Sequence, residues 1–129
     1  MIRFRHVWMN AVTGIAILLV TMMGCASTPG ERPRGSGIQY YGSWSGYQVP
    51  LRPQNPISQS EAKSRIAYYV AEYDQAGHLI RFDKILNGEM EWSDIYTYRD
   101  DGTLQLRKMV KSDGSITEQR FDESGQIIR

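Results

Sequence analysis

The chain has 129 residues, and its 15 Lys and Arg against 14 Asp and Glu leave it close to neutral at pH 7. The two signs are dispersed along the sequence, which argues against a nucleic-acid partner, since nucleic-acid-binding faces are strongly basic. The single cysteine, Cys25, excludes an intramolecular disulfide, so packing and strand pairing must hold the fold together.

Residues 1–24 have the three parts of a secretory signal. Arg3 and Arg5 give a positive start, residues 11–20 form a charge-free apolar run, and the small residue Gly24 precedes Cys25. The apolar run is shorter than the roughly 20 residues that a bilayer span needs. The pattern therefore predicts export rather than a membrane-crossing helix.

Gly24 and Cys25 resemble the end of the lipobox in bacterial lipoprotein signals, with Met22 where Leu is usual. The resemblance implies a diacylglycerol thioether on Cys25, cleavage before it, and acylation of the new amino group. Several acyl chains anchor a protein stably, because each buried CH₂ contributes about 0.8 kcal/mol. Ala26 stands where Asp would favour the inner membrane, which implies the periplasmic face of the outer membrane. A plain signal peptide or an uncleaved anchor is the alternative.

All five prolines lie between Cys25 and Ile57, among glycines and serines. We interpret residues 25–57 as a lipidated tether and residues 58–129 as the folded domain. Within the tether, residues 38–51 are rich in Tyr and Trp. These rings form either an exposed contact loop or a cover for an open face of the following sheet, and their large apolar area favours the cover.

A short template occurs three times after residue 65: an aromatic residue, three polar residues including Asp, Gly, any residue, then Leu or Ile. Asn-Gly and Asp-Gly pairs lie between the copies and favour the type I′ turn that joins hairpin strands. The five turn glycines are Gly77, Gly88, Gly102, Gly114 and Gly125. Their even spacing predicts successive antiparallel strands.

We therefore predict a mainly β fold, a single antiparallel β-meander of about six strands. Ser58 and Glu61 have the spacing of a capping box, which predicts a helical turn over residues 58–64. The predicted strands cover residues 65–73, 79–86, 89–98, 104–111, 115–121 and 126–129.

Alternating apolar side chains in the third and fourth predicted strands fit a half-buried sheet. Asp94 and Lys108 interrupt the apolar faces, which indicates a bulge or an exposed edge. The residues that share a face are Met90, Trp92, Tyr96 and Tyr98 in the third strand, and Leu104, Leu106 and Val110 in the fourth.

The aromatic–Asp–Gly–Leu template resembles the YD-type and YwqK/MORN-like repeats of bacterial surface and secreted proteins. Those repeats build curved antiparallel sheets from serial hairpins. The resemblance covers about residues 66–129 and implies an architecture rather than an activity.

Residues suited to catalysis or metal binding are sparse. His78 is the one histidine after the leader, and no serine lies in a Gly-x-Ser-x-Gly motif. We predict no enzyme, no metal, and no cofactor besides the lipid on Cys25. Aspartates at the turns offer a calcium alternative, although Asp also caps turns through its own backbone. These aspartates are Asp74, Asp100, Asp101, Asp113 and Asp122.

The function predicted from these features is a membrane-anchored binding or structural module of the bacterial envelope. It would contact an envelope protein through a sheet face or edge. The alternatives are a peptidoglycan- or glycan-binding module, whose aromatics stack on sugars, and a small periplasmic hydrolase that uses His78 or the turn acids. The predicted contact residues, for which the domain's own core is the competing explanation, are Trp44, Tyr47, Trp92, Tyr96 and Tyr98.

Overall fold

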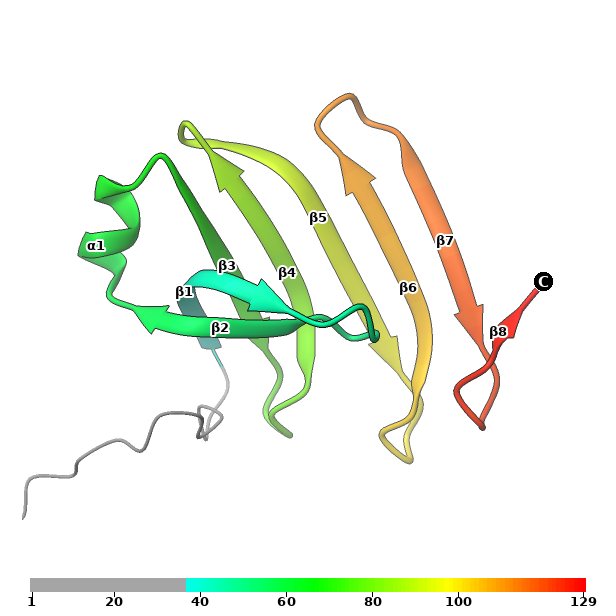
Figure 1. Cartoon of the computed structure of the whole chain (residues 1–129). Helices are drawn as coiled ribbons and strands as arrows, with labels where there is room; N and C mark the ends of the chain where they lie inside the picture. The colour runs from blue at the N-terminus through cyan, green and yellow to red at the C-terminus, as the bar shows by residue number, and fades with distance from the viewer. Residues whose placement is uncertain (1–36) are drawn as a thin grey trace, which may run out of the picture. The chain divides into compact units, whose positions relative to one another are not determined.

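The computed structural model describes residues 37–129, which form one antiparallel sheet of eight strands and one short helix (Figure 1). The strands are β1 (Gly37–Ser45), β2 (Arg52–Ile57), β3 (Ala67–Tyr73), β4 (Leu79–Leu86), β5 (Glu89–Tyr98), β6 (Leu104–Lys111), β7 (Ile116–Phe121) and β8 (Ile127–Ile128). The helix α1 (Gln59–Ser64) lies between β2 and β3 in the chain. No helical segment of residues 37–129 has the length and apolar character needed to cross a membrane.

The strand order across the sheet is β2-β1-β3-β4-β5-β6-β7-β8. From β3 onward each strand pairs with the next one in the chain, so the predicted antiparallel meander is confirmed. The predicted bounds of β4, β5 and β6 agree with the structure, and those of the other three predicted strands differ by one or two residues. The helical turn is also present, with the Glu61 N–H donating to Oγ of Ser58 at 3.0 Å.

The described part of the predicted tether, residues 37–57, forms β1 and β2 of the sheet, so its assignment to a tether is wrong. These two strands raise the count from about six to eight. The prolines did not prevent strand formation, because Pro53 and Pro56 lie in β2, the outermost strand at one edge. A proline on an edge strand removes no N–H that the ladder needs.

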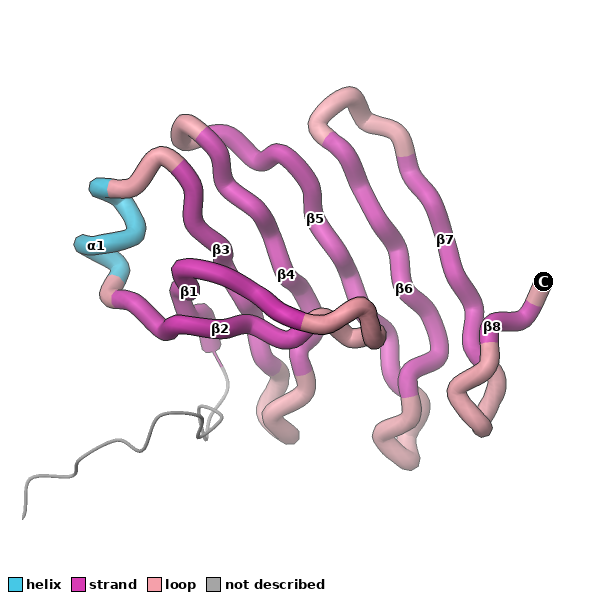
Figure 2. Tube along the Cα trace, viewed as in Figure 1, coloured by secondary structure: helices cyan, strands magenta, loops and turns pink. Residues whose placement is uncertain are grey.

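β1 and β2 form a hairpin that crosses one face of the sheet (Figures 1 and 2). β1 pairs with β3 as far as Tyr41 and then continues with β2 alone. At this point a Cβ on Gly42 would lie 2.9 Å from Nη1 of Arg65, so a larger residue would displace the end of that flexible side chain. The core lies between the hairpin and the sheet, and it consists of Tyr41, Leu51, Ala71, Leu79, Phe82 and Tyr96.

We call the side of the sheet that carries Phe82 and Tyr96 the covered face, and the opposite side, which carries Arg81 and Ile95, the open face. The two sets alternate along β4 and β5, as side chains of a strand do. Because the hairpin covers only one face, the domain has one core rather than two.

The turns of the meander are of two kinds. Asn87 and Gly88 have φ of 51° and 80°, which confirms the predicted type I′ turn there. In the Asp113–Gly114 turn only the glycine has positive φ, so the type I′ prediction is wrong at that turn. This turn and three others are of a longer kind, in which the N–H of the first residue donates to the carbonyl four residues further on. These turns begin at Asp74, Arg99, Lys111 and Asp122.

A β-bulge explains why the predicted face of the fourth strand is only partly correct. The register of β5 with β6 shifts between Thr97 and Tyr98. Leu104 therefore packs against the core, whereas Leu106 pairs with Thr97 on the open face. An extra residue in one strand of a pair produces this change of side.

Candidate functional site

The structure separates the five predicted contact aromatics into two groups. Trp44 and Trp92 meet beneath the hairpin in a T-shaped contact, with ring centroids 6.5 Å apart. Tyr96 is buried in the core, and Tyr98 packs against that core. Tyr47, in the connection between β1 and β2, is 99% exposed. Four of the five rings therefore contribute to the domain's own core, and Tyr47 is free to contact another molecule.

A series of hydrogen bonds fastens the hairpin connection to the covered face. The Leu51 N–H donates to the hydroxyl of Tyr96 at 3.1 Å, and that hydroxyl donates to Oδ2 of Asp94 at 3.0 Å. The same carboxylate oxygen accepts from Nε and Nη2 of Arg107, at 3.0 and 2.6 Å. We call Leu51, Tyr96, Asp94 and Arg107 the hairpin latch.

The latch is buried, and burial determines what it can do. Only 3% of Asp94 is exposed, so its charge needs the compensating guanidinium of Arg107. Burial raises the pKa of Tyr96 well above its ordinary value, so the phenol keeps the proton that it donates to Asp94. These contacts are all internal to the domain. The latch therefore holds the hairpin on the sheet and does not face a ligand.

Sequence reasoning treated Asp94 only as an interruption of an apolar face and did not single out Arg107. The available signal was a charge at an apolar position of a strand, which requires an opposite charge within reach. Arg107 supplies that charge from directly opposite Tyr96 in β6. The predicted bulge is present in the β5–β6 pair, at the register shift between Thr97 and Tyr98, whereas Asp94 itself pairs regularly with Met109 and is buried, so no exposed edge lies there.

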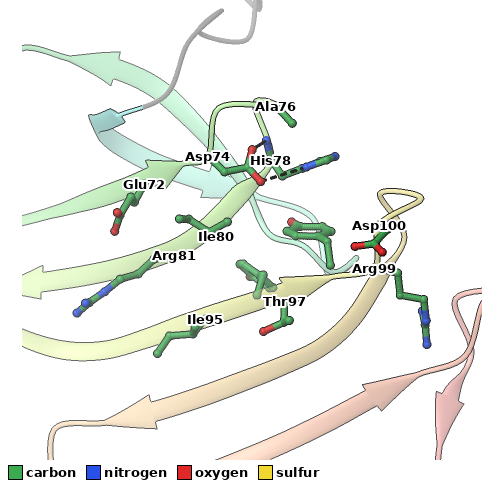
Figure 3. Close-up of a pocket in the computed structure, with 12 residues that line it drawn as sticks. Glu72, Asp74, Ala76, His78, Ile80, Arg81, Ile95, Thr97, Arg99 and Asp100 are labelled. Carbon is green, nitrogen blue, oxygen red and sulfur yellow. Dashed lines mark hydrogen bonds and ion pairs between the residues drawn. The ribbon is translucent and has the colours of Figure 1, made fainter.

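A shallow hollow of about 660 Å³ opens at the ends of β3, β4 and β5, beside their connecting turns (Figure 3). His78 lines it, with its ring stacked on Tyr98 at a centroid distance of 4.7 Å. Nδ1 of His78 lies 3.3 Å from Oδ2 of Asp74. Burial raises the pKa of Tyr98 to about 12, so its stacked ring carries no charge.

The Asp74–His78 pair is the arrangement that comes nearest to catalytic chemistry. A carboxylate on Nδ1 fixes the tautomer of a histidine and leaves Nε2 to accept a proton. No serine or cysteine lines the hollow. Its Arg99 is occupied, because the guanidinium donates to backbone carbonyls at the start of β6 and the end of β7. The hollow thus offers a proton acceptor without a serine or cysteine nucleophile, and no hydrogen bond joins His78 to the hydroxyl of Thr97, so it gives the hydrolase alternative no support.

Four of the five turn aspartates accept hydrogen bonds inside their own turns. Oδ1 of Asp122 accepts from the N–H groups of Ser124 and Gln126, each at 2.9 Å. Asp74, Asp101 and Asp113 accept in the same manner. This capping accounts for the aspartates without an ion. Nor do any three His, Cys, Asp or Glu side chains between residues 37 and 129 lie close enough together to hold a metal.

These hydrogen bonds also set the acidity of the turn carboxyl groups. The backbone N–H of His78 lowers the pKa of Asp74. Hydrogen bonds from the Thr or Ser two residues further on lower the pKa of the other three, Asp101, Asp113 and Asp122. The four turns are therefore more stable when these carboxyl groups are ionised.

The open face carries charged and aliphatic side chains in cross-strand rows. One row runs across five strands through Glu72, Arg81, Ile95, Lys108 and Glu118. Ile38 and Ile116 lie on this face towards its two ends and are 58% and 55% exposed. Opposite charges at neighbouring positions stabilise a sheet modestly.

The two edges of the sheet differ in their capacity to accept another strand. β2 forms one edge and contains Pro53 and Pro56, which have no N–H, and Asn55, whose φ is 54°. At the other edge, β8 pairs only with Arg120 and Phe121 of β7 (Figure 1). The rest of β7 has no strand on its outer side in the described part of the chain.

The family of unknown function DUF6156 matches residues 34–129. The chain belongs to this family. The match includes β1 and β2, so the DUF6156 domain comprises the whole described sheet and not only the meander that the sequence pattern predicts. Comparisons with curated proteins and with solved structures found no match.

Proposed function

We propose that the chain is a lipid-anchored binding or structural protein of the bacterial envelope, held at the periplasmic face of the outer membrane. The observation that carries this proposal is the sequence Met22–Cys25, where an apolar run ends in the one cysteine of the chain. The match to DUF6156 begins at residue 34, so the proposed anchor and the domain are separate parts of the chain. Two or more acyl chains on Cys25 would give stable attachment.

A binding role fits the domain better than a catalytic one. Its buried charges hold the hairpin down, and its turn carboxylates accept hydrogen bonds from their own turns. Towards solvent it presents the open face, the free length of β7 and the ring of Tyr47. An exposed edge strand binds a partner by adding a strand through backbone hydrogen bonds. We therefore propose a protein partner in the envelope, engaged at this edge.

The anchor is tested by Cys25→Ser in cells fed an alkyne-labelled fatty acid. We expect the variant to lose the label and to leave the membrane fraction, because no thiol remains to form the diacylglycerol thioether. The matched control is Cys25→Ser combined with Ser27→Cys, which keeps one cysteine but moves it two residues; it should also lack the label. Unchanged labelling or membrane attachment in either variant would refute the lipid anchor.

Glycan binding is the second candidate, and the exposure of Tyr47 is the observation that favours it. An isolated, fully exposed ring can stack on a sugar, whereas the other four aromatics are wholly or partly covered by the domain's own core. If this candidate is correct, the protein sediments with purified peptidoglycan sacculi and Tyr47→Ala removes most of that binding. Equal sedimentation of the variant and the wild type would exclude Tyr47 as the contact.

A further inference from the structure

The backbone direction along β7 shows which of its hydrogen-bonding groups are free. The Lys111 N–H donates to the Ser115 carbonyl, which places Lys111 and Ser115 in a hydrogen-bonded pair. Such pairs recur every second residue, so the backbone groups of Thr117 and Gln119 also point towards β6. Those of Ile116 and Glu118 point outward.

The hairpin of β7 with β8 gives the same result from the other side. The Asp122 N–H donates to the Gln126 carbonyl, so Asp122 points towards β8, and Arg120, paired with Ile128, does too. By alternation Glu118 and Ile116 point in this direction, beyond the end of β8. The N–H and C=O groups of these two residues are thus presented together at an extended edge that carries no proline.

We propose that the free part of β7 binds the same part of β7 in a second copy of this chain, antiparallel and centred on Thr117. The proposal deepens the proposed binding role by naming the partner, and it does not depend on the lipid. In this register Ile116 lies opposite Glu118 of the partner subunit, and Glu118 opposite the partner's Ile116. All four outward N–H groups of the two strands then find carbonyl acceptors.

The neighbouring registers are excluded by the structure. Centring the pair on Glu118 would set like charges opposite each other and would need backbone groups of Arg120 that already face Ile128. Centring it on Ile116 would set Glu118 against the turn at Gly114, whose φ of 81° is not extended. In the favoured register Arg129, which is exposed and follows the last paired residue of β8, has to turn aside.

Side chains support the same register. Thr117 lies opposite its own copy, and threonine pairs directly across two strands are favourable. Ile116, which is 55% exposed, gains a neighbour on its outer side. The interface is small, so the dimer should be weak in dilute solution. Tethering two copies to one membrane would raise their effective concentration into the range where a weak edge contact forms.

The register is tested by disulfide trapping in the full-length chain carrying Cys25→Ser. In a pair that is not hydrogen-bonded, Cα atoms lie about 4.5 Å apart, within disulfide range. Thr117→Cys should therefore trap a dimer. The matched control is Gln119→Cys, on the same strand and face, whose two copies would lie roughly 14 Å apart, beyond disulfide reach.

We expect the Thr117→Cys variant to cross-link at least about ten times faster than the Gln119→Cys variant, because paired thiols experience millimolar effective concentrations. Adding Glu118→Pro should abolish trapping. The N–H that it removes points away from β6, and the Glu118 carboxylate that it also removes makes only a long, exposed ion pair with Arg120, so circular dichroism should show the sheet retained. Equal rates for the two cysteines, trapping that survives Glu118→Pro, or capture of a different protein at position 117 would overturn the proposal.

The same cross-linking assay tests the lipid anchor separately from this proposal. Wild-type protein with Cys25 intact forms no disulfide if the sulfur of Cys25 carries the diacylglycerol thioether. A wild-type dimer that reducing agent removes would count against the anchor and leave the β7 result unaffected.

Discussion

Removing the carboxylate of Asp94 should destabilise the domain strongly. Asp94→Leu leaves the guanidinium of Arg107, a side chain only 16% exposed, without its ion-pair partner, and it leaves the hydroxyl of Tyr96 without its acceptor. Breaking a buried pair by removing one partner costs about 3–5 kcal/mol. A domain of this size loses roughly 4–8 °C in melting temperature per kcal/mol. We therefore expect a fall of roughly 12–40 °C.

Two further variants show how much of the lost stability comes from the unpaired charge of Arg107 and how much from the hydrogen bonds of Tyr96. In Asp94→Leu with Arg107→Met no buried charge is left unpaired, so the double variant should recover most of the lost stability. Tyr96→Phe keeps the ion pair but leaves the buried Leu51 N–H without an acceptor, which costs about 1–3 kcal/mol. The matched surface control is Glu61→Gln, which removes an exposed ion pair with Arg65 and should change stability by less than about 1 kcal/mol.

Urea denaturation of the full-length protein, followed by far-ultraviolet circular dichroism, measures all four free energies of unfolding. The expected order of loss is Asp94→Leu, then Tyr96→Phe, then the surface control. The reasoning is wrong if Asp94→Leu costs less than about 1 kcal/mol, since a buried guanidinium would then tolerate the loss of its partner. It is also wrong if the double variant is no more stable than the single one.

Three other predictions concern the core, the turns and acid stability. Phe82→Ala, at a side chain with no exposed surface, should lower the free energy of unfolding by about 3–5 kcal/mol in urea titration, and a loss below about 1 kcal/mol would contradict the packing. Gly88→Ala should cost about 1–2 kcal/mol because its φ is 80°, and no change in melting temperature would mean that the turn rearranges. The pKa values of Asp74, Asp101, Asp113 and Asp122 are lowered in the folded state, so their contribution is present at neutral pH and is lost as pH falls below about 4. Melting temperatures at pH 7 and pH 3 should therefore differ less for Asp122→Asn than for the wild type, and an equal difference would contradict the capping role.

The meander was predictable from the sequence because the turn glycines and the even spacing between them indicate the same strand boundaries. All five turn glycines have positive φ in the structure, where residues with a Cβ are strained. Once the turns are placed, the strands between them have little freedom. The β1–β2 hairpin gave no such signal, because prolines and glycines dominate it and its strands form through pairing with β3 and through burial of rings. Propensity alone points to a linker there, and tertiary contacts override it.

The latch was harder to predict for a geometric reason. Counting back from the turn at Gly102 without a bulge places Leu106 opposite Tyr96. The bulge in the β5–β6 pair shifts the register by one residue and puts Arg107 there instead. The charges that interrupt the apolar faces indicate a bulge but not its position, so the partner of Asp94 follows only from the three-dimensional register. The same slip of one residue moves Leu106 to the open face.

The strand order separates the first described residue of the chain from the proposed binding edge. The first described residue, Gly37, pairs with Tyr73 of β3, so the chain enters the sheet near one end of the strand order. β7 lies five strand spacings from β1, which is roughly 24 Å at about 4.8 Å per spacing. The prolines of β2 discourage pairing at the edge nearest the entry point, and the free groups of Ile116 and Glu118 permit it at the far edge. Two copies can therefore meet through β7 while Gly37, the first described residue of each, stays outside the interface, because Gly37 and the free part of β7 lie towards opposite ends of the strand order.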